Sequence, residues 1–168
     1  MIELFWSLLN ITILFFFLYL IVGFLFKGKK IFDSRFKKLS TAIFILGVIQ
    51  IVSANDSSKF DNTINIDNKH NQKNSTYTSK LILEDNLTMN INLSIIYSNE
   101  NEVLTPIKAT SYLTGLVNGY DWKLKSTNTS SKTKDEIRNY NASGILEWKI
   151  FGIKIYSQEK SFTGRIQQ

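Results

Sequence analysis

The segment of residues 4–26 reads LFWSLLNITILFFFLYLIVGFLF, a run of 23 residues without a charged side chain. At about 1.5 Å of rise per residue, a helix of this length extends roughly 34 Å, enough to cross a hydrocarbon core of about 30 Å. The rest of the chain is too polar to surround such a helix as a globular core would. We therefore predict a membrane span over residues 4–26. A cleaved signal peptide is disfavoured, because the apolar run is long and the acidic Glu3 precedes it.

A second apolar run, LSTAIFILGVIQIVSA, occupies residues 39–54. Its 16 residues extend only about 24 Å as a helix, which is short for a span. Phe36 can lengthen the run, and Lys37 and Lys38 can reach the headgroups with their long side chains. We predict a second span over about residues 37–54. Two alternatives stay open: an interfacial or re-entrant helix, and a signal-peptide-like segment cleaved after Ala54.

Basic residues are concentrated between the two runs. The formal net charge of the chain is +6, and residues 27–38 carry six basic side chains against one acidic one. Loops rich in lysine and arginine stay on the cytoplasmic side of a membrane. The loop of residues 27–36 is therefore predicted to be cytoplasmic, with everything from residue 55 onward on the other side. The charge is a topology signal and does not predict a nucleic-acid partner. The topology-determining residues are Lys27, Lys29, Lys30, Arg35, Lys37 and Lys38.

Each apolar run contains one strongly polar amide, Asn10 in the first and Gln50 in the second. In an antiparallel helical hairpin the two amides lie at similar depths. We expect them to hydrogen-bond each other or a partner helix, a contact worth on the order of 1 kcal/mol. The alternative is that both amides simply lie close to the membrane interface.

Residues 55–168 are predicted to form β-strands. In residues 87–97, apolar and polar side chains alternate strictly, which indicates a strand with one buried face. The pair Asn118-Gly119 is a strong hairpin signal and would join strands at 107–117 and 120–125. Gly152 marks a bulge or a tight turn inside an apolar stretch at 144–156. Further strands are expected at 77–83 and 161–166, with a weak one at Ile64 and Ile66. The buried face of the strand at 87–97 would contain Leu87, Met89, Ile91, Leu93, Ile95 and Tyr97.

Six to eight antiparallel strands in about 110 residues predict a small β-sandwich or a partly open β-barrel. The polar stretches 67–75 and 126–143 are expected to be exposed loops. The fold class is thus membrane-anchored all-β. We divide the chain into a two-span transmembrane helical hairpin, residues 1–54, and an extracytoplasmic β-rich domain, residues 55–168.

The sequence offers few means of catalysis. It contains no cysteine, which excludes disulfides and thiolate metal sites, and one histidine, His70, in a polar stretch. Acidic residues occur in small adjacent groups typical of solvated turns, and no phosphate-binding, nucleophile or zinc motif is present. We therefore predict no catalytic residues, no metal and no cofactor. A cysteine-free domain outside the cytoplasm fits a bacterial envelope, so we place the protein in a bacterial cytoplasmic (inner) membrane.

Aromatic residues gather in the carboxy-terminal strands. They either form the core or line a cleft for a ligand or an interface. The patterns Asp121-Trp122-Lys123 and Glu147-Trp148-Lys149 predict that, with both tryptophans directed inward, the flanking charges make cross-strand pairs. The candidate ligand or interface aromatics are Tyr120, Trp122, Trp148 and Tyr156.

These features favour a non-enzymatic envelope protein, an accessory, assembly or interaction subunit with protein partners in the membrane or periplasm. The alternative is a periplasmic binding module for a lipid, a glycan or another apolar ligand. An enzyme is the third and least favoured class.

Overall fold

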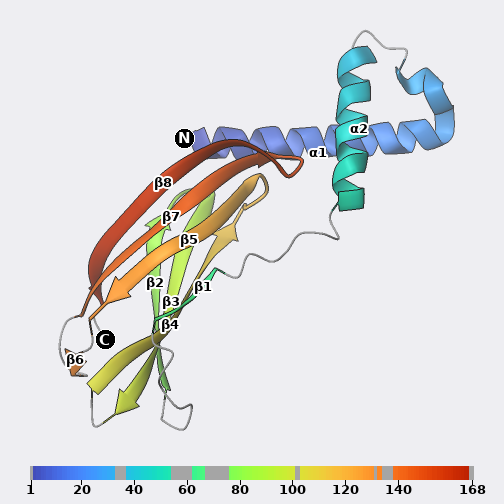
Figure 1. Ribbon diagram of the computed structural model, residues 1–168. Helices are drawn as coiled ribbons and strands as arrows, with labels where there is room; N and C mark the ends of the chain where they lie inside the picture. Colours follow the sequence, from blue (N-terminus) through green and yellow to red (C-terminus); the bar gives the residue numbers. More distant parts are fainter. Residues whose placement is uncertain are drawn as a thin grey trace.

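The computed structural model describes residues 2–32, 37–53, 62–66, 76–100, 103–130, 132–133 and 138–166 (Figure 1). A long helix, α1 (Ile2–Lys27), leads into a short 3-10 helix, η1 (Gly28–Phe32), and a second helix, α2 (Lys37–Ser53), follows. The strands are β1 (Thr63–Asn65), β2 (Thr76–Asp85), β3 (Met89–Glu100), β4 (Val103–Gly115), β5 (Tyr120–Thr129), β6 (Lys132–Thr133), β7 (Arg138–Ile150) and β8 (Ile153–Ile166).

Among the described residues, α1 together with η1 is the one helix long and apolar enough for a membrane anchor or a signal sequence. The second predicted span forms α2, a helix of 17 residues. Figure 1 shows that α2 crosses α1 and does not run antiparallel beside it, as the two helices of a hairpin would. The crossing is close, because a Cβ added at Gly47 would lie 2.3 Å from the Phe17 ring.

The strands form two antiparallel sheets, one ordered β1-β4-β3-β2 with β6 on β4, and one ordered β5-β7-β8. The sheets share two clusters of buried side chains, so the β-rich part of the chain is a sandwich. The alternation predicted for residues 87–97 is confirmed from Met89 onward, where the inward positions are at most 1% exposed. Leu87 is an exception, because it lies in the turn before β3 and is 86% exposed.

The Asn118-Gly119 turn is present, but it does not make a hairpin. The Tyr120 N–H donates to the carbonyl of Val117, and Gly119 has a φ of +85°. The two flanking strands nevertheless belong to different sheets, since β4 pairs with β3 and β5 pairs with β7. The prediction of a hairpin here is therefore wrong, and the turn carries the chain from one sheet to the other.

Towards the end of the chain, the tight turn predicted at Gly152 is confirmed, whereas the strand boundaries differ from the prediction. Gly152 lies in a tight turn, with Phe151 and Gly152 at φ +49° and +74°, which joins β7 to β8. β8 then continues without interruption to Ile166, whereas the sequence predicts a separate last strand that begins only at residue 161. The predicted loop 126–143 is also shorter, because β5 extends to Thr129 and β7 begins at Arg138.

Two polar contacts join the sheets at their edges. The Asn62 side chain donates through Nδ2 to the Trp122 carbonyl at 2.6 Å and accepts the Leu124 N–H through Oδ1 at 3.2 Å. It thereby bonds two backbone groups of β5, as a neighbouring strand would. On the other side, Lys160 of β8 donates to both carboxylate oxygens of Glu84 of β2 at 2.6 Å. Both members of this ion pair are largely buried.

Candidate functional site: the junction of the first helix and the sandwich

The amino-terminal turns of α1 pack against the end of the β5-β7-β8 sheet. Three aromatic residues lie side by side across this sheet, because Trp148 of β7 pairs with Tyr120 of β5 and with Tyr156 of β8. We call Tyr120, Trp148 and Tyr156 the aromatic row. The ring centroids of successive members are 5.3 and 6.1 Å apart.

Trp6 of α1 covers the aromatic row. Its ring centroid lies 5.5 Å from that of Trp148, and its Nε1 donates to the Gly119 carbonyl at 3.1 Å. That carbonyl also accepts the Lys149 N–H at 2.8 Å. Trp6 therefore completes one of the two core clusters of the sandwich, and α1 is structurally part of the β-domain's core.

Tyr120 fixes the start of α1. Its hydroxyl donates to the backbone carbonyl of Glu3 at 2.9 Å. Burial raises the pKa of this phenol to about 12, so Tyr120 stays neutral at physiological pH and acts as a hydrogen-bond donor. This arrangement positions the helix and leaves the phenol unsuited to accept a proton as a general base.

The polar side chains in the first turns of α1 face the sandwich. Ser7 and Asn10 are 2% and 7% exposed, whereas the exposed large side chains of this helix are apolar or aromatic. Asn10 donates its Nδ2 to the Trp6 carbonyl one turn earlier at 3.1 Å. A Cβ added at Gly119 would lie 2.5 Å from the same amide nitrogen, so a glycine there allows the close approach. The expected contact with Gln50 lies outside the described residues, because the Gln50 side chain is not among them.

Phe17 is the point where three elements meet. It contacts Phe44 of α2, with ring centroids 6.3 Å apart, and Phe151 of the β7–β8 turn at 5.7 Å. The Phe17 side chain is 4% exposed. The sandwich therefore follows α1 from Glu3 to Phe17, roughly 21 Å along the helix.

A small hollow of about 270 Å³ lies between α1 and the turns at 117–119 and 151–152. It is partly polar, with Asn10 and Lys149 beside Ile13, Leu14 and Phe151. A larger and shallower hollow, about 610 Å³, lies toward the opposite ends of the β5-β7-β8 strands and is lined by polar groups that include Asn128, Asn139, Asn141 and Arg165. Neither hollow is lined by Trp122, Trp148 or Tyr156.

The four predicted aromatics are divided between core and surface. Trp122 is two residues after Tyr120 on β5 and pairs with Leu146 of β7. Its side chain is 1% exposed, and its Nε1 donates to the Ser111 hydroxyl at 2.8 Å. Tyr120 and Trp148 are buried under α1. Tyr156, at the outer end of the aromatic row, is 58% exposed.

The flanking charges form the cross-strand pairs that the sequence predicts. Lys123 donates to Glu147 at 2.8 Å, and Lys149 donates to Asp121 at 2.6 Å. Burial alone would raise the pKa of the Glu147 carboxyl, but Lys123 and Lys149 outweigh it and hold that pKa below its usual value. Burial would likewise lower the pKa of Lys149, and its acidic neighbours raise it instead. Both groups are therefore charged at neutral pH.

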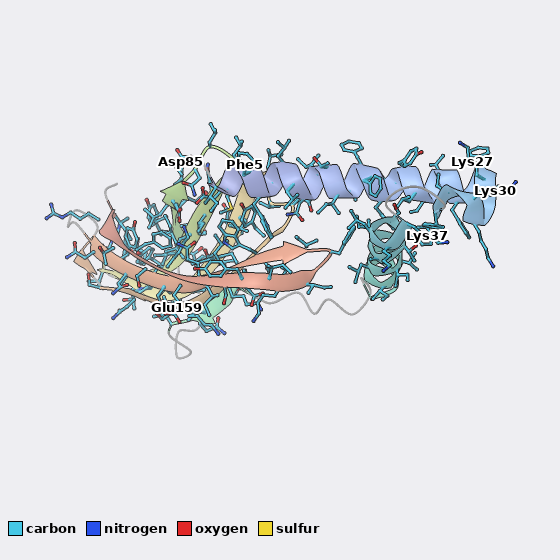
Figure 2. All side chains as sticks on the ribbon, turned by 90° about the horizontal axis from the view of Figure 1, so that it is seen from above. Phe5, Lys27, Lys30, Lys37, Asp85 and Glu159 are labelled. Carbon is cyan, nitrogen blue, oxygen red and sulfur yellow. The ribbon has the colours of Figure 1, made fainter. Side chains whose placement is uncertain are left out.

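The topology-determining lysines belong to the helical region and not to this junction. Lys27 and Lys30 lie at the end of α1 that is remote from the sandwich, and Lys37 lies on α2 (Figure 2). Lys29 belongs to η1 and Lys38 to the first turn of α2, whereas Arg35 lies outside the described residues. Within the part of the chain that the structure describes, no group of three or more His, Asp or Glu side chains could hold a metal ion. His70 lies outside that part.

Trp6 and Gly119 are the junction residues that sequence reasoning missed. Trp6 lies in a helix that is apolar on every side, so no periodicity indicates which face meets protein. The spacing of Ser7 and Asn10 is the one available signal, because positions three apart share a face of a helix.

No protein-family model and no curated protein matches the chain. Among solved structures, the chain is similar to the crystal structure of a two-domain protein of unknown function from Bacteroides thetaiotaomicron, with 18% sequence identity and a TM-score of 0.41. The similarity covers 54% of this chain and 47% of that one, so it spans about half of each protein. A likeness this weak carries no argument about function.

Proposed function

We propose that the protein is a non-enzymatic, membrane-anchored interaction subunit of a bacterial envelope complex, held in the cytoplasmic membrane with its sandwich on the extracytoplasmic side. The observation that carries the proposal is the way α1 is built. One face of α1 contributes Trp6 to the sandwich core, and the rest of the helix surface leaves large apolar side chains uncovered, such as Phe5 and Phe15 at 75% and 66% exposure.

This construction couples the anchor rigidly to the domain. A flexible tether would keep a catalytic or binding domain near a membrane without fixing its orientation. Here the two Trp6 contacts and the Tyr120 hydroxyl fix the sandwich against the helix over several turns. Such a unit can present defined surfaces to a partner, from the helix within the membrane and from the sandwich beside it.

The charge distribution supports the proposed orientation. The start of α1 and the sandwich lie together, and Lys27 and Lys30 lie at the remote end of α1 (Figure 2). Lysine-rich segments stay on the cytoplasmic side, which puts the sandwich on the other side. Protease added to sealed right-side-out spheroplasts should therefore digest the sandwich, whereas a sandwich protected until the cells are lysed would contradict this orientation.

The ligand-binding alternative has less support. Trp122 and Trp148 fill the core, and neither of the two hollows described above lies between the sheets. A binding module would need an apolar cavity there.

The proposal is tested by extracting the tagged full chain from its native membrane in mild detergent and measuring the mass of the intact assembly by native mass spectrometry. We expect a discrete complex with at least one further membrane protein. The matched control is the double variant Leu8→Ala, Phe15→Ala on the uncovered face of α1, which keeps an apolar helix but removes its large side chains. It should remain in the membrane and lose the partner. A monomer from the unaltered chain would contradict the proposal.

A further inference from the structure

The end of the sandwich that meets α1 has an apolar surface. In the β4–β5 turn, Leu116 and Val117 are 53% and 37% exposed. At the start of β8, Ile153 and Ile155 are 50% and 57% exposed. We call these four residues, together with Phe151, the apolar tip. Contiguous exposed apolar side chains on a small domain mark a contact surface for protein or membrane.

The apolar tip lies beside the middle of α1, because Phe151 packs on Phe17. Phe17 is ten residues before Lys27, which corresponds to about 15 Å of helix. That distance is about half of a hydrocarbon core of roughly 30 Å. If α1 crosses a bilayer with Lys27 at one surface, Phe17 lies near the midplane. Phe151 then lies at hydrocarbon depth as well.

The polar residues of α1 indicate that the sandwich stays docked in the membrane. Polar side chains within a membrane span face protein and not lipid. Ser7 and Asn10 both face the sandwich in this structure, where they are nearly fully buried. Undocking α1 would turn both of them toward acyl chains, so the membrane reinforces this contact.

We propose that the apolar tip enters the bilayer leaflet on the sandwich side, next to α1, so that lipid acyl chains are its partner. This inference rests on the proposed anchoring by α1. The β7–β8 hairpin is suited to such a position, because a two-residue turn closes it and Ile150 pairs directly with Ile153. Backbone groups that are paired in this way avoid the cost of unsatisfied hydrogen bonds in hydrocarbon.

Two lysines lie close to the β7–β8 turn, and their surroundings differ. Lys149 and Lys154 are register partners on β7 and β8, next to the turn. The Lys149 ammonium group is held by Asp121 at 2.6 Å and by Glu147 at 3.4 Å. The Lys154 side chain is 56% exposed, and a lysine in such a position can bury its aliphatic stem along apolar surroundings and extend its ammonium group to the headgroup layer. The exposed part of this hairpin therefore combines two apolar residues, Ile153 and Ile155, with one lysine between them that can reach the headgroup layer.

The test uses the absence of cysteine from the chain. Single-cysteine variants of the full chain, Ile153→Cys at the apolar tip, Phe15→Cys on the uncovered face of α1 and Ser161→Cys farther along β8, are labelled with an environment-sensitive fluorophore. Each is reconstituted into vesicles of phosphatidylethanolamine and phosphatidylglycerol containing a lipid with a nitroxide on its acyl chain. All three sites are exposed, so the fold should tolerate the labels, and near-ultraviolet circular dichroism verifies this.

We expect the fluorophore at position 153 to be quenched severalfold, as at position 15, and the one at position 161 to remain unquenched. Quenching at 15 without quenching at 153 would overturn this inference and leave the anchoring intact. Absence of quenching at both sites would contradict the anchoring itself, and with it the proposed function. Equal quenching at 153 and 161 would also overturn the inference, because it would show a sandwich lying flat on the membrane and not inserted by its tip.

Discussion

Replacing Trp6 by alanine should loosen the sandwich, although Trp6 belongs to the helix. Truncation of a buried tryptophan costs about 3–5 kcal/mol. Because Trp6 is only half-buried, we expect roughly 2–3 kcal/mol, including about 1 kcal/mol for the lost hydrogen bond to Gly119. The matched control is Phe5→Ala in the same helical turn. Phe5 is 75% exposed, and its truncation should change stability by less than about 0.5 kcal/mol.

Hydrogen exchange of the full chain in nanodiscs measures this effect locally. The Lys149 amide is the reporter, because it donates to the same Gly119 carbonyl as Trp6 and lies where β5, β7 and α1 meet. Since 1.4 kcal/mol corresponds to a factor of ten, the Trp6 variant should exchange this amide roughly 30- to 150-fold faster. Exchange at Lys149 that is equally fast in the Trp6 and Phe5 variants would refute the claim that α1 contributes to the sandwich core.

Three further predictions concern the sandwich and its charges. Asn62→Ala should lower the free energy of unfolding by about 1–3 kcal/mol, because it leaves the Trp122 carbonyl and the Leu124 N–H without a partner. Denaturant titrations measure this change, with Asn65→Ala at an exposed position of β1 as the control. Gly119→Ala should accelerate amide hydrogen exchange at Lys149, since the φ of Gly119 is +85° and the new Cβ would meet Asn10. An additional Asn10→Ala change should relieve part of this acceleration. Fully additive effects of the two substitutions would argue against the contact. Glu147 has a folded-state pKa below 4.5, so its ion pairs stabilise the fold above that pH, and this stabilisation is lost as the pH falls through the folded-state pKa. Glu147→Gln should therefore flatten the acid side of a plot of unfolding free energy against pH. The control Glu159→Gln, on the exposed face of β8, should leave that plot unchanged.

The sequence predicted those features that depend on local alternation. The inward face of β3 follows directly from the period of two between Met89 and Tyr97. The charge pairs around Trp122 and Trp148 follow from the same rule, since neighbours of an inward residue point outward. The amino-terminal helix follows from the length of the uncharged run.

Features that depend on distant contacts could not be predicted in this way. The Asn118-Gly119 turn is encoded locally, but the pairing of its two strands is not, and Trp6 holds the turn from more than a hundred residues away. The middle of β8 is polar because it lies at a sheet edge, so its composition resembles that of a loop. The sequence does not indicate that Trp6 faces the sandwich, because the helix has no polar side apart from the single pair Ser7 and Asn10.

The ion pair between Lys160 and Glu84 has a consequence for copies that share a membrane. β8 is a 14-residue strand at one edge of its sheet, and such an edge can pair with a strand of another molecule. Under the proposed anchoring, copies diffuse in two dimensions with a common orientation, so their edges meet more often than those of free molecules. Lys160 donates to both carboxylate oxygens of Glu84, so the ion pair reaches from β8 to β2, the edge strand of the other sheet. By linking the two edge strands on this side of the sandwich, the Lys160–Glu84 pair is expected to hinder the addition of a strand from a neighbouring copy.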